Sequence, residues 1–284
     1  MTGPLPGVFS VSDSKKVRFS PGNLYVKKDD SGNWNLNFYD EQYACNSLNS
    51  TWTWNTQTKR PISKDDNESD LFSWGYGEWS EKLYSPKSDA KSYVEGHDDP
   101  EKDGEQFSKI EDWGYAFGGE SSVWRTLNAD EWEYLFGKST KRNGKYKCGV
   151  TVCGHPNCVV LLPDDWKWEG AVGADWQKNT MGVFEYSDSE KLTVKWSSME
   201  AAGAVCLPAA GYSTGSIVMG VELYCAYWTS SGTSEYVYCE GEEEYFEGKD
   251  FAYYLWIANG GVNSRDFSER MQGNSVRLVT DVPE

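Results

Sequence analysis

The composition of the sequence predicts an all-β or α+β protein, and we expect the α+β class, with short strands outnumbering helices. Aromatic residues make up 15% of the 284 residues, with 14 Trp and 18 Tyr, and the chain contains 28 Gly. This composition suits short strands and many turns better than a helical bundle. The clearest helix signals lie in 128–137. No periodic repeat and no clear linker is visible, so we expect one elaborated domain over 1–284, with a scaffold in 8–205 and a distinct C-terminal region in 206–280.

Two short strands are expected near the start, at 8–11 and 17–19. The turn-forming residues 12–16 separate them, and Ser20-Pro21-Gly22-Asn23 ends the second. From about 26 to 122 the sequence is polar and loop-like, but isolated Trp residues recur in it. Aromatics at irregular spacing indicate long loops pinned to a core. They are Trp52, Trp54, Trp74, Trp79 and Trp113.

A helix is predicted over 128–137. Asn128 can cap its N-terminus and Glu131 stands three residues later, which is the spacing of a capping box. Gly137 fits its end. The apolar residues expected to face the core are Leu127, Trp132, Leu135 and Phe136.

A β-hairpin is predicted after this helix. The apolar runs 147–153 and 158–162 are joined by Gly154-His155-Pro156-Asn157, which has turn chemistry. Residues 167–200 are expected to form another loop region that ends in a short helix around 197–202.

The charge of the chain excludes some classes of partner. Lys and Arg number 27 against 44 Asp and Glu, which gives a formal net charge of −17. Nucleic acids and anionic lipid surfaces would be repelled. No apolar run approaches the roughly 20 residues of a membrane-spanning helix, so we expect no membrane insertion. Residues 1–7 also lack the order of a secretion signal.

Seven cysteines are spread over the chain, and their odd number does not indicate a disulfide framework. Cys148, Cys153 and Cys158 with His155 do not have the spacing of a zinc site. We expect Cys153 and Cys158 to face each other across the hairpin turn, as a packed pair or as a disulfide. Carboxylates cluster at 65–66, 97–101 and 240–244, but no ordered calcium loop is visible. No cofactor is therefore predicted, and calcium is left open without assigned ligands.

Several strings together resemble the C-type lectin fold of two related groups. These groups are the variable proteins of diversity-generating retroelements, abundant in gut Bacteroidetes and their phages, and the formylglycine-generating enzyme superfamily. The strings cover most of 8–280 in order and spacing. They are Val17-Arg18-Phe19-Ser20-Pro21-Gly22-Asn23-Leu24, Asp112-Trp113-Gly114, Trp124-Arg125-Thr126-Leu127-Asn128-Ala129-Asp130-Glu131-Trp132-Glu133-Tyr134-Leu135, Leu162-Pro163-Asp164-Asp165-Trp166, Leu207-Pro208-Ala209-Ala210-Gly211, Tyr227-Trp228-Thr229-Ser230-Ser231 and Ser275-Val276-Arg277-Leu278-Val279.

The resemblance implies that the first and last strands pair, with 17–19 near 276–278. It also implies that a small twisted sheet displays late residues on an outward face. The oxidase branch holds copper with two C-terminal cysteines, for which this chain offers only Cys225 and Cys239, without the Arg-rich string around them. We therefore expect no enzymatic activity.

The C-terminal region has the composition of a binding surface, because Tyr and Trp provide contact area while Ser, Gly and Asn adapt their hydrogen bonds. In the retroelement group, adenine-directed variation yields residues such as Tyr, Ser, Asp, Phe and Arg. Trp256, Glu269, Met271 and Gln272 do not fit that process and are framework or have another codon history. The expected partner is a protein or glycan ligand on a cell surface, and the expected location is a cell or virion surface. A fixed adhesin or glycan binder, and then a formylglycine-type oxidase, are the alternatives. The expected ligand-binding residues are Tyr224, Tyr227, Trp256, Ser264, Arg265, Asp266, Phe267, Ser268 and Asn274.

Overall fold

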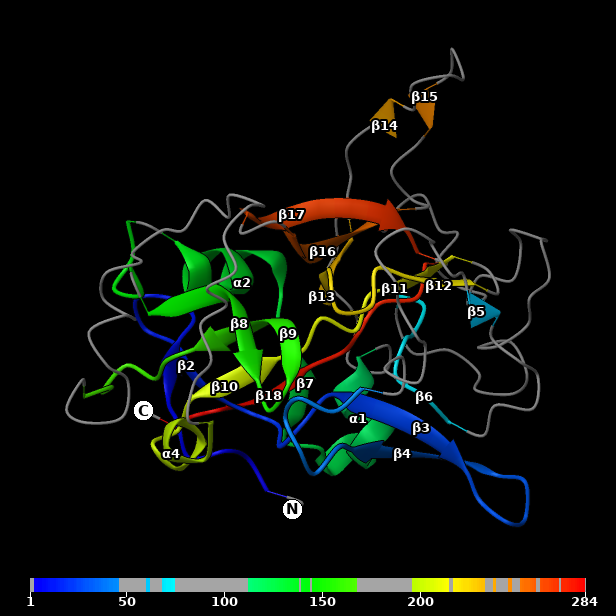
Figure 1. The fold of residues 1–284 in the computed structure, drawn as a ribbon, viewed down its shortest axis with the longest axis horizontal. Coiled ribbons are helices and arrows are strands. Elements are labelled where there is room, and N and C mark those ends of the chain that lie inside the picture. The colour runs from blue at the N-terminus through cyan, green and yellow to red at the C-terminus, as the bar shows by residue number, and fades with distance from the viewer. Residues whose placement is uncertain are drawn as a thin grey trace.

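Over the residues that it describes, the computed structural model shows a mixed α+β protein with mostly antiparallel strands in several small sheets and three short helices (Figure 1). It describes residues 3–45, 60–61, 68–74, 112–137, 139–143, 145–167, 196–214, 217–232, 237–238, 245–246, 251–258, 261–270 and 272–283. The long segments between these ranges lie outside the described residues, and with them three of the five Trp residues expected in loops, Trp52, Trp54 and Trp79.

The beginning and the end of the chain share one sheet. Its order is β1 (Phe9–Ser10), β2 (Lys16–Phe19), β18 (Leu278–Asp281) and β7 (Trp124–Thr126). Val279 lies opposite Phe19 on one side and Arg125 on the other. The expected pairing of an early with a late strand is therefore confirmed. The late strand begins at Leu278, two residues after the start of the range 276–278 that the resemblance implied.

The predicted capped helix is confirmed as α2 (Ala129–Phe136). The Asn128 side chain accepts a hydrogen bond from the Glu131 amide at 2.8 Å, and the Glu131 carboxylate accepts one from the Asn128 amide at 3.0 Å. These bonds satisfy amides that a helix start leaves free. Trp132 and Leu135 are buried against the first sheet and against the C-terminal strands, as the apolar face predicted.

The predicted hairpin exists, but its turn lies earlier than expected. Strands β8 (Tyr146–Val152) and β9 (His155–Leu161) meet at a two-residue turn formed by Cys153 and Gly154. Both turn residues have positive φ, 49° and 92°, which matches the twist of a tight hairpin. β10 (Val205–Leu207) pairs with the other side of β9. The short helix expected around 197–202 is confirmed as α4 (Trp196–Ala201).

The segment from 26 onward is more ordered than the prediction of loops allowed. β3 (Leu24–Lys28) and β4 (Trp34–Phe38) form a hairpin, and β6 (Glu68–Ser69) pairs with β3. Helix α1 (Trp113–Gly118) follows the N-cap Asp112 and continues into the 3-10 turn η3 (Gly119–Ser121). The expectation of loops is thus wrong for these elements. Leu24 and Val26 are buried and alternate with the half-buried Tyr25 and the exposed Lys27, but two buried residues are too few to identify a strand by pattern alone.

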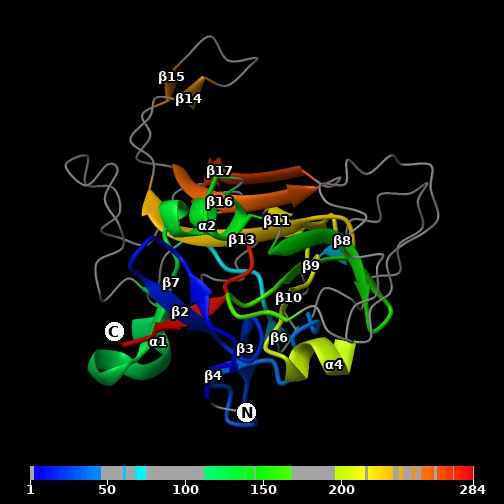
Figure 2. The ribbon, with the colours of Figure 1, turned by 90° about the vertical axis from the view of Figure 1, so that its left-hand side faces the viewer.

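Three C-terminal strands form the sheet at the top of the molecule in Figures 1 and 2. Its order is β13 (Cys225–Gly232), β16 (Phe251–Ala258) and β17 (Gly261–Glu269), all antiparallel. β11 (Tyr212–Thr214), β12 (Ile217–Met219) and β5 (Arg60–Pro61) form a neighbouring sheet. The short strands β14 (Val237–Tyr238) and β15 (Tyr245–Phe246) pair between β13 and β16 in the chain.

Strand β13 lies between two parts of the hydrophobic core. Tyr227 and Cys225 face the cluster that contains α2, β2 and β9, whereas Ala226 and Trp228 face the cluster that contains β3, α1 and β7. Every residue of β13 is buried as a result. A strand covered on both faces is a rigid base for the strands that pair with it.

Candidate functional site

Burial falls steeply across the three strands of the C-terminal sheet. All residues of β13 are buried, β16 is mostly buried, and every residue of β17 is at least partly exposed. β17 is more exposed than β13 and β16 because of both its sequence and its position in the sheet. β17 reads Gly-Val-Asn-Ser-Arg-Asp-Phe-Ser-Glu, so it offers little apolar surface to bury, and within the described residues it forms the edge of its sheet.

Cross-strand neighbours show which side chains share a face of this sheet. Tyr253 lies opposite Phe267, and Tyr254 lies opposite Asp266. Residues directly opposite on paired strands point to the same side. Tyr253, Arg265 and Phe267 lie on the side that faces α2, which we call the helix-side face. The other side carries Tyr254, Trp256, Asp266 and Ser268.

An aromatic cluster surrounds Trp256 on this second side. The ring centroid of Trp256 lies 4.6 Å from Tyr224, 5.7 Å from Tyr212 and 6.0 Å from Tyr254. These are contact distances for tilted and edge-on aromatic pairs. Tyr212, Tyr224 and Trp256 are half-buried, so the cluster leaves ring surface in contact with solvent.

A glycine makes room for one ring of the cluster. Gly220 has a φ of +69°, and a Cβ placed there would lie 2.1 Å from Cδ2 of Tyr224. Any larger residue would therefore strain the backbone and displace the Tyr224 ring.

A row of polar side chains continues from the aromatic cluster. The Tyr254 hydroxyl donates to Asp266 Oδ2 at 3.4 Å, and the Ser268 hydroxyl donates to Gln272 Oε1 at 2.6 Å. Gln272 Nε2 in turn donates to Asn274 Oδ1 at 3.0 Å. Burial, and next the charge of Asp266, raise the pKa of Tyr254, so its hydroxyl stays a proton donor at neutral pH.

The aromatic cluster and the polar row lie together on this side of the sheet, which we call the aromatic–polar face; Tyr254 is buried within it, and its other members are half-buried. It combines flat apolar rings with a carboxylate, an amide and a hydroxyl, which is the mixture that fixes the orientation of a bound ligand. No group in it is arranged as a nucleophile with an adjacent base. Its residues are Tyr212, Tyr224, Tyr254, Trp256, Asp266, Ser268 and Gln272.

The helix-side face has a different chemistry. The Arg265 guanidinium forms ion pairs with Asp130 and with Glu133 of α2, the latter at 2.7 Å, and lies 5.8 Å from the centre of the Tyr253 ring. Phe267 packs edge-on against Phe251 and keeps 40% of its surface exposed. This face therefore presents an exposed aromatic ring among charges.

The structure places the expected ligand-binding residues in three groups. Tyr224, Trp256, Asp266 and Ser268 lie on the aromatic–polar face, and Arg265 and Phe267 lie on the helix-side face. Ser264 is half-buried at the bulge of β17. For the remaining two of the nine, Tyr227 and Asn274, the expectation is wrong.

Tyr227 and Asn274 do not lie on a surface, because both are fully buried. The Tyr227 hydroxyl donates to the Pro208 carbonyl and accepts a hydrogen bond from the Asn23 amide. Its strand is covered on both faces, so the aromatic string around it is core. Asn274 is held through its backbone opposite Phe72 and lies beneath Gln272.

Sequence reasoning missed three members of the aromatic–polar face. Gln272 was set aside as framework, and Tyr212 and Tyr254 were not singled out among 18 Tyr residues. The available signal was the alternation of Tyr254 with Leu255 and Trp256 in a strand, but Tyr212 reaches the cluster from a separate sheet. Only the fold brings them together.

The described residues give little support to a copper site at Cys225 and Cys239 or to a pair formed by Cys153 and Cys158. Cys225 is buried, and burial raises the pKa of its thiol well above the usual range, while Cys239 lies outside the described residues. Cys153 sits exposed in the hairpin turn and Cys158 is buried opposite Val150, so the expected facing pair is wrong and both thiols are free. The turn begins earlier than predicted, which separates them.

Within the described ranges, no three His, Cys, Asp or Glu side chains are grouped so as to hold a metal ion. The acidic stretches 65–66, 97–101 and 240–244, to which calcium was left open, lie outside those ranges.

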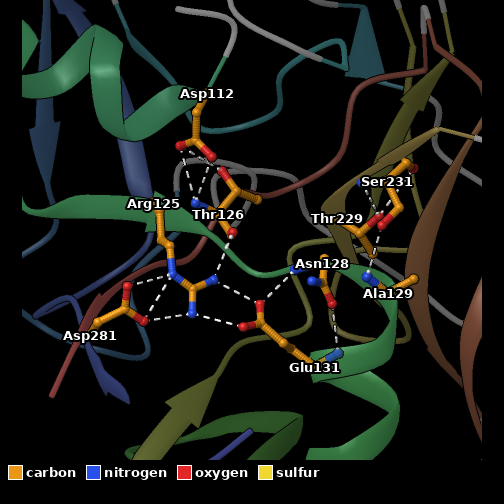
Figure 3. Close-up of polar contacts among 9 residues, drawn as sticks. All are labelled: Asp112, Arg125, Thr126, Asn128, Ala129, Glu131, Thr229, Ser231 and Asp281. Atoms are coloured by element: carbon orange, nitrogen blue, oxygen red, sulfur yellow. Dashed lines mark hydrogen bonds and ion pairs between the residues drawn. The ribbon is translucent and has the colours of Figure 1, made fainter. Parts of the chain in front are cut away.

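Polar residues of the motif strings hold the scaffold together (Figure 3). Asp112 accepts hydrogen bonds from the amides of Gly114 and Thr126, at 2.7 Å and 3.0 Å. Ser231, at the end of β13, accepts one from the Ala129 amide at the start of α2. These contacts bind α1, β7, α2 and β13 to one another, so the residues that carry the resemblance act structurally in this chain.

Comparisons with known proteins identify no relative. No family model matches the chain, and neither a curated protein nor a solved structure is found to match it. Among the described residues, no helix has the length and apolar character needed to cross a membrane.

Proposed function

We propose that this protein is a non-enzymatic recognition protein that binds a ligand on a cell surface through the end of its C-terminal sheet. The observation that carries the proposal is the gradient from the fully buried β13 to β17, in which every residue is at least partly exposed. A rigid base with a chemically rich edge lets side chains change without loss of the fold. The aromatic–polar face is the proposed ligand-binding surface, with Trp256 and Tyr224 as aromatic anchors.

The proposed architecture is a C-type lectin fold of the kind used by retroelement variable proteins. Three features support it: the sheet shared by β2 and β18, the capped helix α2 beside it, and the scaffold contacts made by Asp112 and Arg125. The C-terminal residues are proposed to have arisen by retroelement-driven diversification of a binding face. Residues 264–268, which are compatible with adenine-directed variation, are all at least partly exposed.

The gene sequence of closely related isolates tests the origin. Substitutions should cluster at Tyr224 and at 264–268 and should spare Tyr227, because Tyr227 is buried and its loss would remove core contacts. Substitutions spread evenly over the chain would instead favour a fixed adhesin or glycan binder, for which the same aromatic surface is suited.

A binding experiment tests the function itself. The purified protein would be applied to arrays of glycans and of bacterial surface proteins, together with the variants Trp256→Ala and Trp34→Ala. Trp34 is the matched control, because it is also half-buried but lies on β4. At least one captured ligand should bind about tenfold or more weakly to Trp256→Ala and normally to Trp34→Ala. Equal binding by both variants, or no captured ligand, would contradict the proposal.

A further inference from the structure

Among the described residues, β17 has one unpaired edge. Within the described residues it pairs only with β16, and Figures 1 and 2 both show it as the outermost strand of its sheet. The amide of Arg265 donates to Asn263 Oδ1 and the amide of Phe267 donates to Asp266 Oδ1, each at 3.1 Å. Since these amides bond to side chains of β17 itself, they point away from β16.

The usual protection of such an edge is incomplete here. Edge strands commonly avoid pairing by being short or by carrying Lys or Pro. β17 has nine residues and contains neither Lys nor Pro. Its bulge near Arg265 and the local bonds from Asn263 and Asp266 are the protections it has. Those local bonds are replaceable, because the carbonyl oxygens of an incoming strand would accept from the same amides.

The charges beside the edge indicate what would pair with it. Asp130 and Glu133 on α2 are 79% and 57% exposed, and Glu269 ends β17 in solvent. Arg265 is the one basic residue of β17 and is already paired with the two carboxylates of α2. The whole chain carries −17. A second copy would therefore be repelled, whereas a basic segment would be attracted.

We propose that the outer edge of β17 binds an extended, basic segment of a partner protein by strand addition. Backbone hydrogen bonds to the amides of Arg265 and Phe267 would provide affinity, and carboxylates of α2 would select basic side chains. The exposed Phe267 ring would contact apolar side chains of the same segment. This site adjoins the aromatic–polar face at Asp266 but uses backbone amides of Arg265 and Phe267, so either proposal can fail without the other.

A fluorescent peptide of alternating Lys and Val tests the proposal by anisotropy. Its control has the same side chains but carries N-methyl groups on every backbone amide, which blocks both edges of the peptide and keeps the charge. The unmodified peptide should bind about 30-fold more tightly, as expected for two backbone hydrogen bonds. Equal affinity of the two peptides would show attraction by charge alone and would overturn strand addition.

Variants of the protein locate the site. Phe267→Pro should abolish peptide binding while keeping the pairing with β16, because the Phe267 amide points outward. Phe267→Ala is the matched control for loss of the ring and should retain most of the binding. Glu133→Gln should weaken binding about two- to fivefold, with the difference disappearing at high salt.

Hydrogen exchange of the unaltered protein provides a readout that needs no variant. The amides of Arg265 and Phe267 should exchange rapidly in the free protein and become protected when the Lys-Val peptide is added. Failure of this peptide to bind, binding without protection of these amides, or protection that arises from self-association without peptide would each refute the proposal.

Discussion

Arg125 joins three elements of the scaffold through its guanidinium. Its Nη1 and Nη2 atoms donate to the two carboxylate oxygens of Glu131 at 2.7 Å and 2.8 Å. Its Nε atom donates to Asp281 at 3.0 Å. Arg125 belongs to β7, Glu131 to α2 and Asp281 to β18, so one side chain connects the helix to the last strand (Figure 3).

The two ion pairs of Arg125 should contribute unequally to stability. The side chain of Glu131 is 6% exposed, whereas that of Asp281 is 62% exposed. Removing one partner of a buried ion pair costs roughly 3–5 kcal/mol, and an exposed pair contributes about 0–1 kcal/mol. Because Arg125 is itself 26% exposed, water can partly hydrate Glu131 once its partner is gone. We therefore expect Arg125→Met to lower the free energy of unfolding by about 2–4 kcal/mol.

Urea titration followed by tryptophan fluorescence measures these changes. Asp281→Asn is the matched control and should cost about 1 kcal/mol or less. Glu131→Gln should cost more than Asp281→Asn, since it weakens the buried pair and the cap of α2 together. If Asp281→Asn is as costly as Glu131→Gln, or if Arg125→Met costs less than about 1 kcal/mol, burial does not govern this contact as described.

Two further predictions concern acid stability and thiol reactivity. Burial would raise the pKa of Asp164, but hydrogen bonds from Ser10 and the charge of the buried Arg142 outweigh it and lower that pKa below 3.8. The charged Asp164 stabilises the fold above pH 3.8, and this stabilisation is lost as the pH falls through the lowered pKa. Asp164→Asn should therefore reduce the loss of unfolding free energy in that pH range. If the unfolding free energy of the variant falls with pH as steeply as that of the unaltered protein, this prediction is contradicted. Iodoacetamide should modify the exposed Cys153 in the native protein but the buried Cys225 only after unfolding, as measured by peptide mass mapping. If Cys225 of the native protein is labelled at a rate comparable to Cys153, its thiol is not buried.

Local signals in the sequence were sufficient for several elements. The capping pair Asn128 and Glu131 located α2 to within one residue, because helix caps depend on neighbours in the sequence. The hairpin of β8 and β9 was found from its apolar runs, but the turn was misplaced. Gly154-His155-Pro156-Asn157 has the stronger turn composition, yet Cys153 and Gly154 adopt the positive φ values that the tight turn requires.

The candidate site depended on information that the sequence does not carry locally. Tyr227 and Trp256 lie in similar aromatic strings, but Tyr227 is on a strand with core on both faces and Trp256 is half-buried on β16, beside the edge strand β17. Tyr212 joins the cluster from another sheet. Which aromatic residues are accessible is decided by the packing of whole elements, and composition alone cannot distinguish them.

The shared sheet of β2 and β18 has a practical consequence for engineering. It brings the first and last described residues to one side of the molecule, while β17 lies on the opposite side in both views (Figures 1 and 2). If a linker joined the two ends, new ends could be opened at the exposed Cys153–Gly154 turn. Likewise, a carrier or a fluorescent tag fused at either terminus would be held at a distance from β17, which makes the chain suited to presentation on a bead or a sensor chip.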